Sequence, residues 1–532
     1  MKYNLKNLVL SLVAITGFVI SGCQKGDLLS NPNVVAETAT VPASLLLNHI
    51  TSNMMKEEEP IISNVYRYNQ NIVSNYSYYF GSNAYNWSTT SDTYDQIRYC
   101  SKLEEQAQKQ YGNTTNIYFA LSKFFRAYSF VWLTQRVGDI PMSQAVNTAI
   151  LTPKYDSQHD VYKNSLALLD TANTLISNLY TTATAGNKVD AAGDVFGLTY
   201  VQWQQVINTY KLRVLISLSK RAIDNADLNI PGQFATIYNN PAKYPIMGSN
   251  SDNMYFKYTA ITLYPPNRAG NAPYNNCANV NKTFMNLLTA NQDPRTFVLT
   301  TPALKYITSG AKTVGDFTAY VGLDNNLSQS GFANFSSDSS YACMNYYRYM
   351  NAASGANAEP YIVIGYPEMC FNIAEAANRG WIAASGATWY LNGINASLSL
   401  YGITQGKTVS VGDYSGNKTS YGSVTLDVYN FLANANVAYA GDNATGLSQI
   451  LTQKYIAFWM NSGYEAFYNQ RRTGIPTFAQ GGTGIGTPSA TIPLRWQYPL
   501  SEINYNSDNY KAAIQSQYGG TDDLNAKMWL IK

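Results

Sequence analysis

The chain has 532 residues, of which 45% are hydrophobic and only 13% are charged, and its 36 basic and 33 acidic side chains give a formal net charge of +3. No cluster of lysines and arginines is present, which excludes a nucleic-acid-binding surface, because affinity for phosphates comes largely from displaced counterions. Polarity comes instead from neutral side chains and from 44 tyrosines, which favours an uncharged ligand.

The N-terminus has the features of a lipoprotein export signal. An apolar run, Leu8–Ile20, follows two lysines and is too short to span a bilayer permanently. Two small residues then precede Cys23, which predicts cleavage after residue 22 and a lipid on Cys23. The alternative, a buried first helix, does not account for this order of features. Several acyl chains on one residue would anchor the protein stably.

These features divide the chain into three parts. Residues 1–22 are predicted to be a signal peptide, and residues 23–40 are predicted to be a lipidated tether, because they are polar and contain proline without apolar periodicity. Residues 41–532 are expected to form a single body. Beyond Cys23 no stretch approaches 18 apolar residues, so the lipid is expected to be the membrane attachment.

The first part of the body, about residues 41–238, is predicted to be helical. Apolar and aromatic residues recur there at the three- and four-residue spacing of a helix face. Three stretches have this pattern: Leu121–Trp132, Tyr162–Leu179 and Trp203–Val214. Thr199 and Gln202 have the spacing of a capping box, so we expect the third helix to begin there.

About residues 239–360 are rich in glycine, asparagine, proline and tyrosine, which predicts long ordered loops with a short helix at Phe284–Leu288. Helical periodicity returns over about residues 361–470. It appears in Cys370–Ala377, Tyr390–Tyr401 and Leu447–Phe467, and a second loop-rich segment covers about residues 471–532.

The first two of these helices are expected to form a hairpin. Gly380 and Gly402 would end them, because glycine adopts the left-handed conformation that closes many helices. Such pairs, as in tetratricopeptide units, bury their apolar faces by stacking on neighbours.

The cysteines after Cys23 fall into two groups. Cys100 and Cys370 lie in predicted helices and are expected to be small core residues. Cys277 and Cys343 lie in the loop-rich middle, and the sequence leaves open whether they are bridged.

Short motifs recur in a specific order along the chain. In the first half they are Phe125-Arg126-Ala127, Gly138-Asp139-Ile140-Pro141, Leu212-Arg213 and Asp293-Pro294-Arg295. In the second half they are Glu375–Trp381 followed by Tyr390 and Gly393-Ile394, then Gln453–Ala457, Glu465-Ala466, Arg471–Pro476, Pro493–Arg495 with Tyr498-Pro499, and Gly519-Gly520 before Asp522-Asp523. With these motifs the chain resembles the SusD/RagB family of surface nutrient-binding lipoproteins of the Bacteroidetes, in its SusD-like branch.

The resemblance implies an all-α fold, a tetratricopeptide-like helical hairpin scaffold that carries long irregular ligand-binding loops. It also implies an outer-membrane protein that is lipid-anchored, faces the cell exterior and delivers nutrient to a SusC-like TonB-dependent transporter without chemistry of its own. Glu375 and the pair Arg471-Arg472 are expected to form ion pairs or cap helices inside the scaffold, because arginine is costly to bury unpaired.

Two aromatic clusters are the candidate ligand site. The first consists of Tyr78, Tyr79, Tyr85, Asn86, Trp87, Asp92 and Tyr94, and the second of Tyr341, Tyr346 and Tyr347. A sugar has apolar C–H faces and hydroxyl edges, so flat rings with neighbouring amides and carboxylates complement it. A peptide could use the same surface. The alternative is that the rings pack the loops against the scaffold.

The sequence predicts no catalytic residue, no metal ligand and no cofactor. Its two histidines, His49 and His159, lie in contexts that support neither a zinc site nor a nucleophilic triad. Gly402–Thr408 includes Gly-Lys-Thr, but three residues separate its glycines where a phosphate loop needs four.

The main alternative function is a helical glycoside hydrolase or lyase with two carboxylates beside the scissile bond. A surface adhesin without a small ligand is the third candidate function. We expect a receptor for an oligosaccharide or, alternatively, a peptide.

Overall fold

The computed structural model describes residues 40–57, 63–74, 83–85, 87–190, 192–258, 278–327, 331, 339–349, 359–412, 420–480 and 491–532. Contacts group Ala43–Lys532 into one unit and the residues up to Pro42 into another. The predicted signal peptide, Cys23 and almost all of the predicted tether lie outside the described residues and stay predictions.

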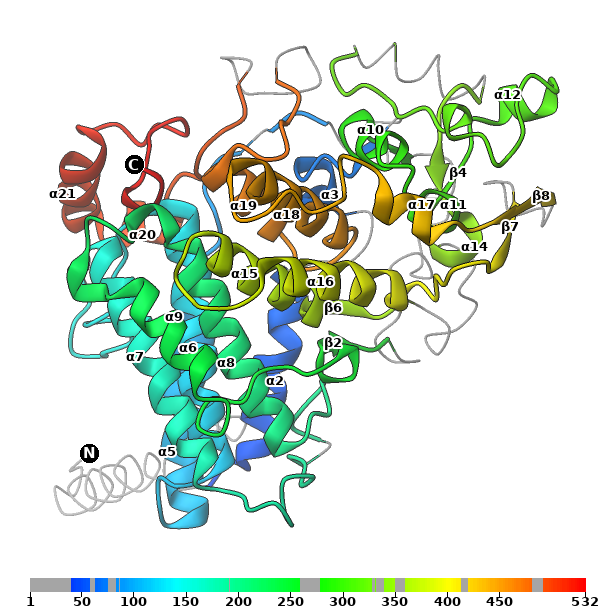
Figure 1. Ribbon diagram of the computed structural model, residues 1–532. Coiled ribbons are helices and arrows are strands. Elements are labelled where there is room, and N and C mark those ends of the chain that lie inside the picture. Colours follow the sequence, from blue (N-terminus) through cyan, green and yellow to red (C-terminus); the bar gives the residue numbers. More distant parts are fainter. Residues whose placement is uncertain are drawn as a thin grey trace, which may run out of the picture. The chain divides into compact units, whose positions relative to one another are not determined.

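Consecutive long helices of the first half pack on one another (Figure 1). They are α2 (Ala43–Glu57), α5 (Tyr94–Tyr111), α6 (Ile117–Val137), α7 (Gln158–Ser177) and α8 (Tyr200–Ser217). Each packs against the next, α2 on α5 through to α7 on α8. The three stretches predicted to be helical are α6, α7 and α8, and their apolar faces are buried.

The predicted capping box begins α8. The Thr199 hydroxyl accepts a hydrogen bond from the backbone N–H of Gln202 at 3.3 Å, and the Gln202 side chain accepts one from the backbone N–H of Thr199 at 3.1 Å. Both residues thus satisfy N–H groups that a helix start leaves without an intrahelical partner.

A second set of helices packs on α8 through α15. The predicted hairpin consists of α15 (Tyr366–Asn378) and α16 (Gly386–Leu400), and α18 (Ala444–Ala457) covers both. A Cβ atom at Gly393 would lie 2.8 Å from the Phe371 ring, so glycine allows the two helices of the hairpin to approach. The tetratricopeptide-like description is confirmed.

The predicted helix Leu447–Phe467 is divided in the structure. α18 ends at Ala457 and α19 (Glu465–Thr473) begins eight residues later. Between them the chain turns against β6 (Tyr361–Ile364), because the backbone N–H of Ser462 donates to the Ile362 carbonyl at 2.8 Å. The Asn461 side chain accepts from the Ile362 N–H at 2.9 Å. This contact between remote segments explains the break.

Shorter helices lie both in the loop-rich segments and between the long helices. In chain order they are α3 (Asn64–Tyr68), α9 (Ile230–Asn239), α10 (Lys282–Ala290), α11 (Arg295–Leu299), α12 (Leu304–Thr308), α14 (Tyr346–Tyr349), α17 (Val428–Ala433), α20 (Leu500–Tyr505) and α21 (Ser507–Tyr518). The predicted short helix at Phe284–Leu288 lies within α10. None of the helices in the described ranges combines the length and apolar character that a membrane span needs.

Within the described residues the structure also has three small antiparallel sheets, which were not predicted. One has the order β1 (Ile72–Ser74), β3 (Ala278–Val280), β5 (Cys343–Met344) and β4 (Thr300–Thr301). The others pair β2 (Met254–Phe256) with β6, and β7 (Thr408–Gly412) with β8 (Ser420–Thr425). The strands of the first two sheets are short and pair with segments far away in sequence, so local alternation does not reveal them. β7 and β8 are instead neighbours in sequence.

Cysteines occupy the expected environments. Cys100 and Cys370 are fully buried. Cys343 is a free thiol, whereas Cys277 lies outside the described residues.

Candidate functional site

The structure anchors the two predicted aromatic clusters on one sheet. β1 leads into the first cluster and β5 into the second, and β3 lies between them. Ser74 faces Ala278 in the first pairing, and Asn279 faces Cys343 in the second. Segments remote in sequence are therefore joined to one sheet, with β3 between β1 and β5.

The Asn83 side chain closes the edge of this sheet. Its carbonyl oxygen accepts from the backbone N–H of Ser74, and its amide donates to the Ser74 carbonyl, both at 2.7 Å. Asn83 thus replaces a neighbouring strand and ties the two ends of the intervening segment together. The predicted residues Tyr78, Tyr79 and Asn86 lie outside the described residues.

Two rings of the first cluster are buried. Tyr85 is 0% exposed and donates its hydroxyl hydrogen to the Tyr68 carbonyl at 2.8 Å. Trp87 is 6% exposed and stacks on Trp496 with a centroid distance of 3.8 Å. An edge-on contact with Phe467 at 4.9 Å completes this packing. Tyr85 and Trp87 therefore pack the loop against the scaffold, the alternative that the sequence had left open.

Asp92 and Tyr94 lie apart from these rings. The Tyr94 hydroxyl donates to the Pro141 carbonyl at 3.0 Å, and burial together with the negative charge of Glu502 raises the pKa of Tyr94. Asp92 accepts from the Ser501 hydroxyl at 2.6 Å. It also lines a cavity of about 180 Å³ between α2, α5 and α6.

The second cluster is only partly described. Tyr341 is half-buried and packs against Val73 of β1 and Leu323. The side chains of Tyr346 and Tyr347, at the start of α14, lie outside the described residues. Tyr341 therefore lies beside the sheet that joins the clusters.

A recess of about 490 Å³ lies at the start of α10, immediately after β3, and we call it the α10 recess. It is lined by the first turns of α10, by the turn Asp324–Asn326 and by Pro476–Ala479. Leu323 holds the turn in place, because its N–H donates to the Val280 carbonyl at 2.8 Å and its carbonyl accepts from the N–H of Lys282 at 2.9 Å.

Gln70, which precedes β1, positions another wall of the α10 recess. Its side-chain oxygen accepts from the Thr283 hydroxyl at 2.7 Å and from the Ala479 N–H at 2.9 Å. Its amide donates to the Ala479 carbonyl at 2.8 Å. One buried amide therefore connects α10, the chain before β1 and the segment that follows α19.

The polar groups of the recess are neutral in sum. Lys282 Nζ donates to Asp324 Oδ2 at 3.0 Å, and Asp324 Oδ1 accepts from the Asn326 N–H at 2.9 Å. Asn325 is 3% exposed, and its Oδ1 has no hydrogen-bond partner among the described residues. Sequence analysis missed these residues, although the Asp-Asn-Asn run at 324–326 was a polar signal within a loop-rich segment.

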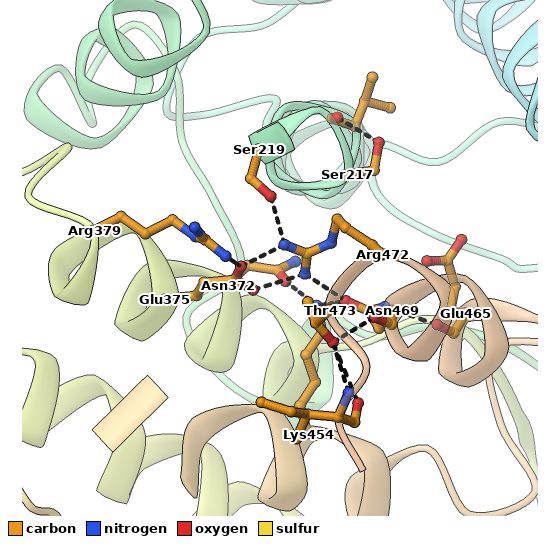
Figure 2. A network of polar contacts seen from close by, with 12 residues as sticks. Ser217, Ser219, Asn372, Glu375, Arg379, Lys454, Glu465, Asn469, Arg472 and Thr473 are labelled. Atoms are coloured by element: carbon orange, nitrogen blue, oxygen red, sulfur yellow. Dashed lines mark hydrogen bonds and ion pairs between the residues drawn. The ribbon is translucent and has the colours of Figure 1, made fainter. Parts of the chain in front are cut away.

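The motif residues Glu375 and Arg472 form an ion pair inside the scaffold (Figure 2). Arg472 donates to Glu375 at 2.5 and 2.9 Å, and Arg379 adds a bond at 2.9 Å. Burial opposes the charge of Glu375, but the attraction of Arg472 outweighs it and lowers the pKa to about 2. Lys454, also buried, donates to Asn372 at 2.6 Å. The predicted structural role of Glu375 and Arg472 is confirmed.

Other motif residues also act within the scaffold. Arg471 donates to the carbonyls of Leu494 at 2.7 Å and Gln135 at 3.0 Å. Asp293 and Arg295 are fully buried and form an ion pair at 2.6 Å. Arg471, Asp293 and Arg295 therefore act in connecting the helices, whereas Pro476, at the end of the Arg471–Pro476 motif, lines the α10 recess.

A tetratricopeptide-like scaffold, stabilised by buried ion pairs and carrying a polar recess beside a small sheet, defines an all-α helical-hairpin protein. The chain matches the SusD-like family described as "Starch-binding associating with outer membrane" over residues 32–499, and it belongs to this family.

Solved structures show the same fold. A SusD homologue from Bacteroides fragilis, 26% identical, has a TM-score of 0.75 and covers 92% of this chain and 100% of its own. A second SusD homologue from that species, 29% identical, has a TM-score of 0.73 and covers 92% and 99%. A chitin-binding protein, 20% identical, has a TM-score of 0.68 with 92% and 99% coverage. No curated protein matches the sequence at a significant level.

Proposed function

We propose that this protein captures an oligosaccharide at the cell surface and passes it, unaltered, to a SusC-like TonB-dependent transporter. Membership of a family described as starch-binding supports the ligand class. The structural observation that carries the proposal is the placement of the α10 recess beside the sheet from which both tyrosine-rich segments depart. The transporter and the transfer of ligand rest on the family resemblance.

The membrane attachment is part of the same proposal. Cleavage after residue 22 would expose Cys23 for acylation, and the tether would place the body outside the outer membrane. Replacing Cys23 with alanine should release the protein from outer-membrane fractions. Retention of the Cys23→Ala variant in that fraction would contradict the lipid anchor.

The carboxylates favour binding over hydrolysis. Glycoside hydrolysis uses two carboxyl groups about 5–10 Å apart across the bond that is cleaved. Among the described residues that line the α10 recess, Asp324 is the one carboxylate, and it is paired with Lys282. Glu375 and Asp522, which lie in family motifs, pair with Arg472 and Arg495 inside the scaffold. The described residues of this recess therefore do not supply the two carboxylates that glycoside hydrolysis uses.

The test is calorimetry of the purified protein against neutral hexasaccharides, namely maltohexaose, cellohexaose, xylohexaose and chitohexaose, with product analysis of the same samples. Maltohexaose and chitohexaose represent the ligands named for the family and for one similar structure. Saturable binding without cleavage is expected. Cleavage would establish the enzyme alternative, and binding of peptides alone would change the ligand class.

The partner requires a separate measurement. Affinity purification of the full-length protein from detergent-solubilised outer membranes should recover a TonB-dependent transporter, identified by mass spectrometry. Recovery of the protein alone would contradict the transfer step while leaving ligand capture intact.

A further inference from the structure

The rim of the α10 recess presents one donor group and one acceptor group side by side. Lys282 Nζ and Asp324 Oδ2 are 3.0 Å apart, and their side chains are 53% and 32% exposed. An ammonium group has three donors, and an ionised carboxylate has only acceptor sites. The contact between them uses one donor of Lys282, so both groups can bind a ligand as well.

Asn325 lines the recess but is almost completely buried. Its Oδ1 is enclosed by the protein, so a ligand in the recess does not reach it. Lys282 and Asp324, whose side chains are 53% and 32% exposed, are accessible to a ligand at the rim.

The remaining lining has a different chemistry. Leu287, Pro476 and Phe478 contribute apolar side chains, and Asn286 and Thr283 contribute neutral polar ones. One lysine and one aspartate make the lining neutral in sum. An anionic ligand would therefore meet the repulsion of Asp324 when it approaches Lys282.

We propose that the α10 recess binds one unit of a neutral sugar through two adjacent ring hydroxyls, held by Lys282 and Asp324. Adjacent hydroxyls are spaced like the Lys282–Asp324 pair, so one accepts from the ammonium group while the other donates to the carboxylate. The apolar side chains face the C–H groups of the ring. This assignment rests on the receptor role proposed above.

A peptide satisfies this arrangement less well. In a trans peptide unit the N–H and the C=O point to opposite sides, so one unit does not meet two groups 3.0 Å apart as two adjacent ring hydroxyls can. An acidic sugar keeps its ring hydroxyls, but Asp324 repels its carboxylate.

The experiment measures the affinity of the four neutral hexasaccharides and of hexagalacturonate for wild type, Asp324→Asn and Lys282→Met. Each substitution should weaken binding of the preferred neutral hexasaccharide about tenfold, the loss expected for a hydrogen bond to a charged group. Hexagalacturonate should bind wild type more weakly than that ligand. Asp324→Asn should keep the melting temperature of wild type, because the asparagine oxygen can still accept from the Asn326 N–H.

Matched controls come from another surface ion pair. Lys163 and Asp227 are 3.1 Å apart with side-chain exposures of 55% and 48%, and they lie on α7 and the segment before α9. Lys163→Met should leave the affinity for every hexasaccharide unchanged.

The outcomes separate the two proposals. If wild type binds a neutral hexasaccharide and both variants retain its affinity, the recess is not the sugar site, but the receptor role stands. If wild type binds none of the hexasaccharides, the receptor role fails for these glycans and the recess assignment fails with it. If peptides bind and the same variants weaken them, the recess is a binding site whose ligand class was assigned wrongly.

Discussion

Glu375 provides a quantitative test of the buried network in Figure 2. Its carboxylate is fully buried and accepts two hydrogen bonds from Arg472 and one from Arg379. The substitution Glu375→Gln keeps the shape and removes the charge. It leaves Arg472, whose side chain is 4% exposed, without its counter-ion. Breaking a buried pair in this way costs about 3–5 kcal/mol.

The pKa provides a second route to the magnitude. A pKa lowered from 4.5 to about 2 corresponds to about 3.4 kcal/mol of stability at pH 7. Because the pKa is lower in the folded state, this contribution is complete above pH 4.5 and is lost as the pH falls towards 2. At pH 3 about 1.4 kcal/mol remains. The free-energy loss expected from breaking the buried pair and the loss expected from the lowered pKa of Glu375 therefore agree.

Urea denaturation of wild type and Glu375→Gln at pH 7 and pH 3 measures both quantities. We expect a difference in unfolding free energy of about 3 kcal/mol at pH 7 that falls by about 2 kcal/mol at pH 3. Glu105→Gln on α5 is the matched control, because Glu105 also accepts from two basic side chains, Lys102 and Lys109, but is exposed. It should cost about 0.5 kcal/mol or less. A difference for Glu375→Gln below about 1 kcal/mol at pH 7, or one independent of pH, would refute the reasoning.

Three further outcomes are expected. Trp87→Ala should lower the unfolding free energy by about 3–5 kcal/mol in denaturant titrations, because it removes a buried ring stacked on Trp496; weaker glycan binding with unchanged melting would instead place Trp87 at the ligand. Thr199→Ala should cost about 1 kcal/mol, seen as a lower melting temperature, whereas Thr199→Ser should retain the cap; equal melting of both variants would contradict the capping role. Burial raises the pKa of the Cys370 thiol to about 12, so mass spectrometry should find Cys370 unmodified after iodoacetamide treatment of native protein at pH 8 and modified after denaturation; rapid native labelling would contradict its burial.

Local signals in the sequence predicted the helices well. The apolar faces of α6, α7 and α8 follow the 3.6-residue period, and the Thr199–Gln202 cap lies within four residues. The break between α18 and α19 was not predictable in this way. It depends on Ile362, about a hundred residues earlier, which holds the turn at Ser462. Periodicity within one segment carries no information about such a partner.

For the candidate site, too, the sequence predicted local features but not the contacts between distant segments. Aromatic density and asparagine content marked the chain around Trp87 and Tyr341, but composition does not reveal which rings other side chains cover. Burial of Trp87 results from Trp496 and Phe467, which lie near the other end of the chain.

The sequence by itself determined the family and the helical content, because each depends on residue identity or on neighbours within a turn or two. It predicted a structural role for Glu375 and Arg472, but tertiary structure decided that these two residues pair. Tertiary structure alone decided that Lys282, Asp324 and Pro476–Ala479 surround one recess, and that Asn83 closes the edge of β1. Such arrangements come from pairing and packing between distant segments, whose register no local pattern records.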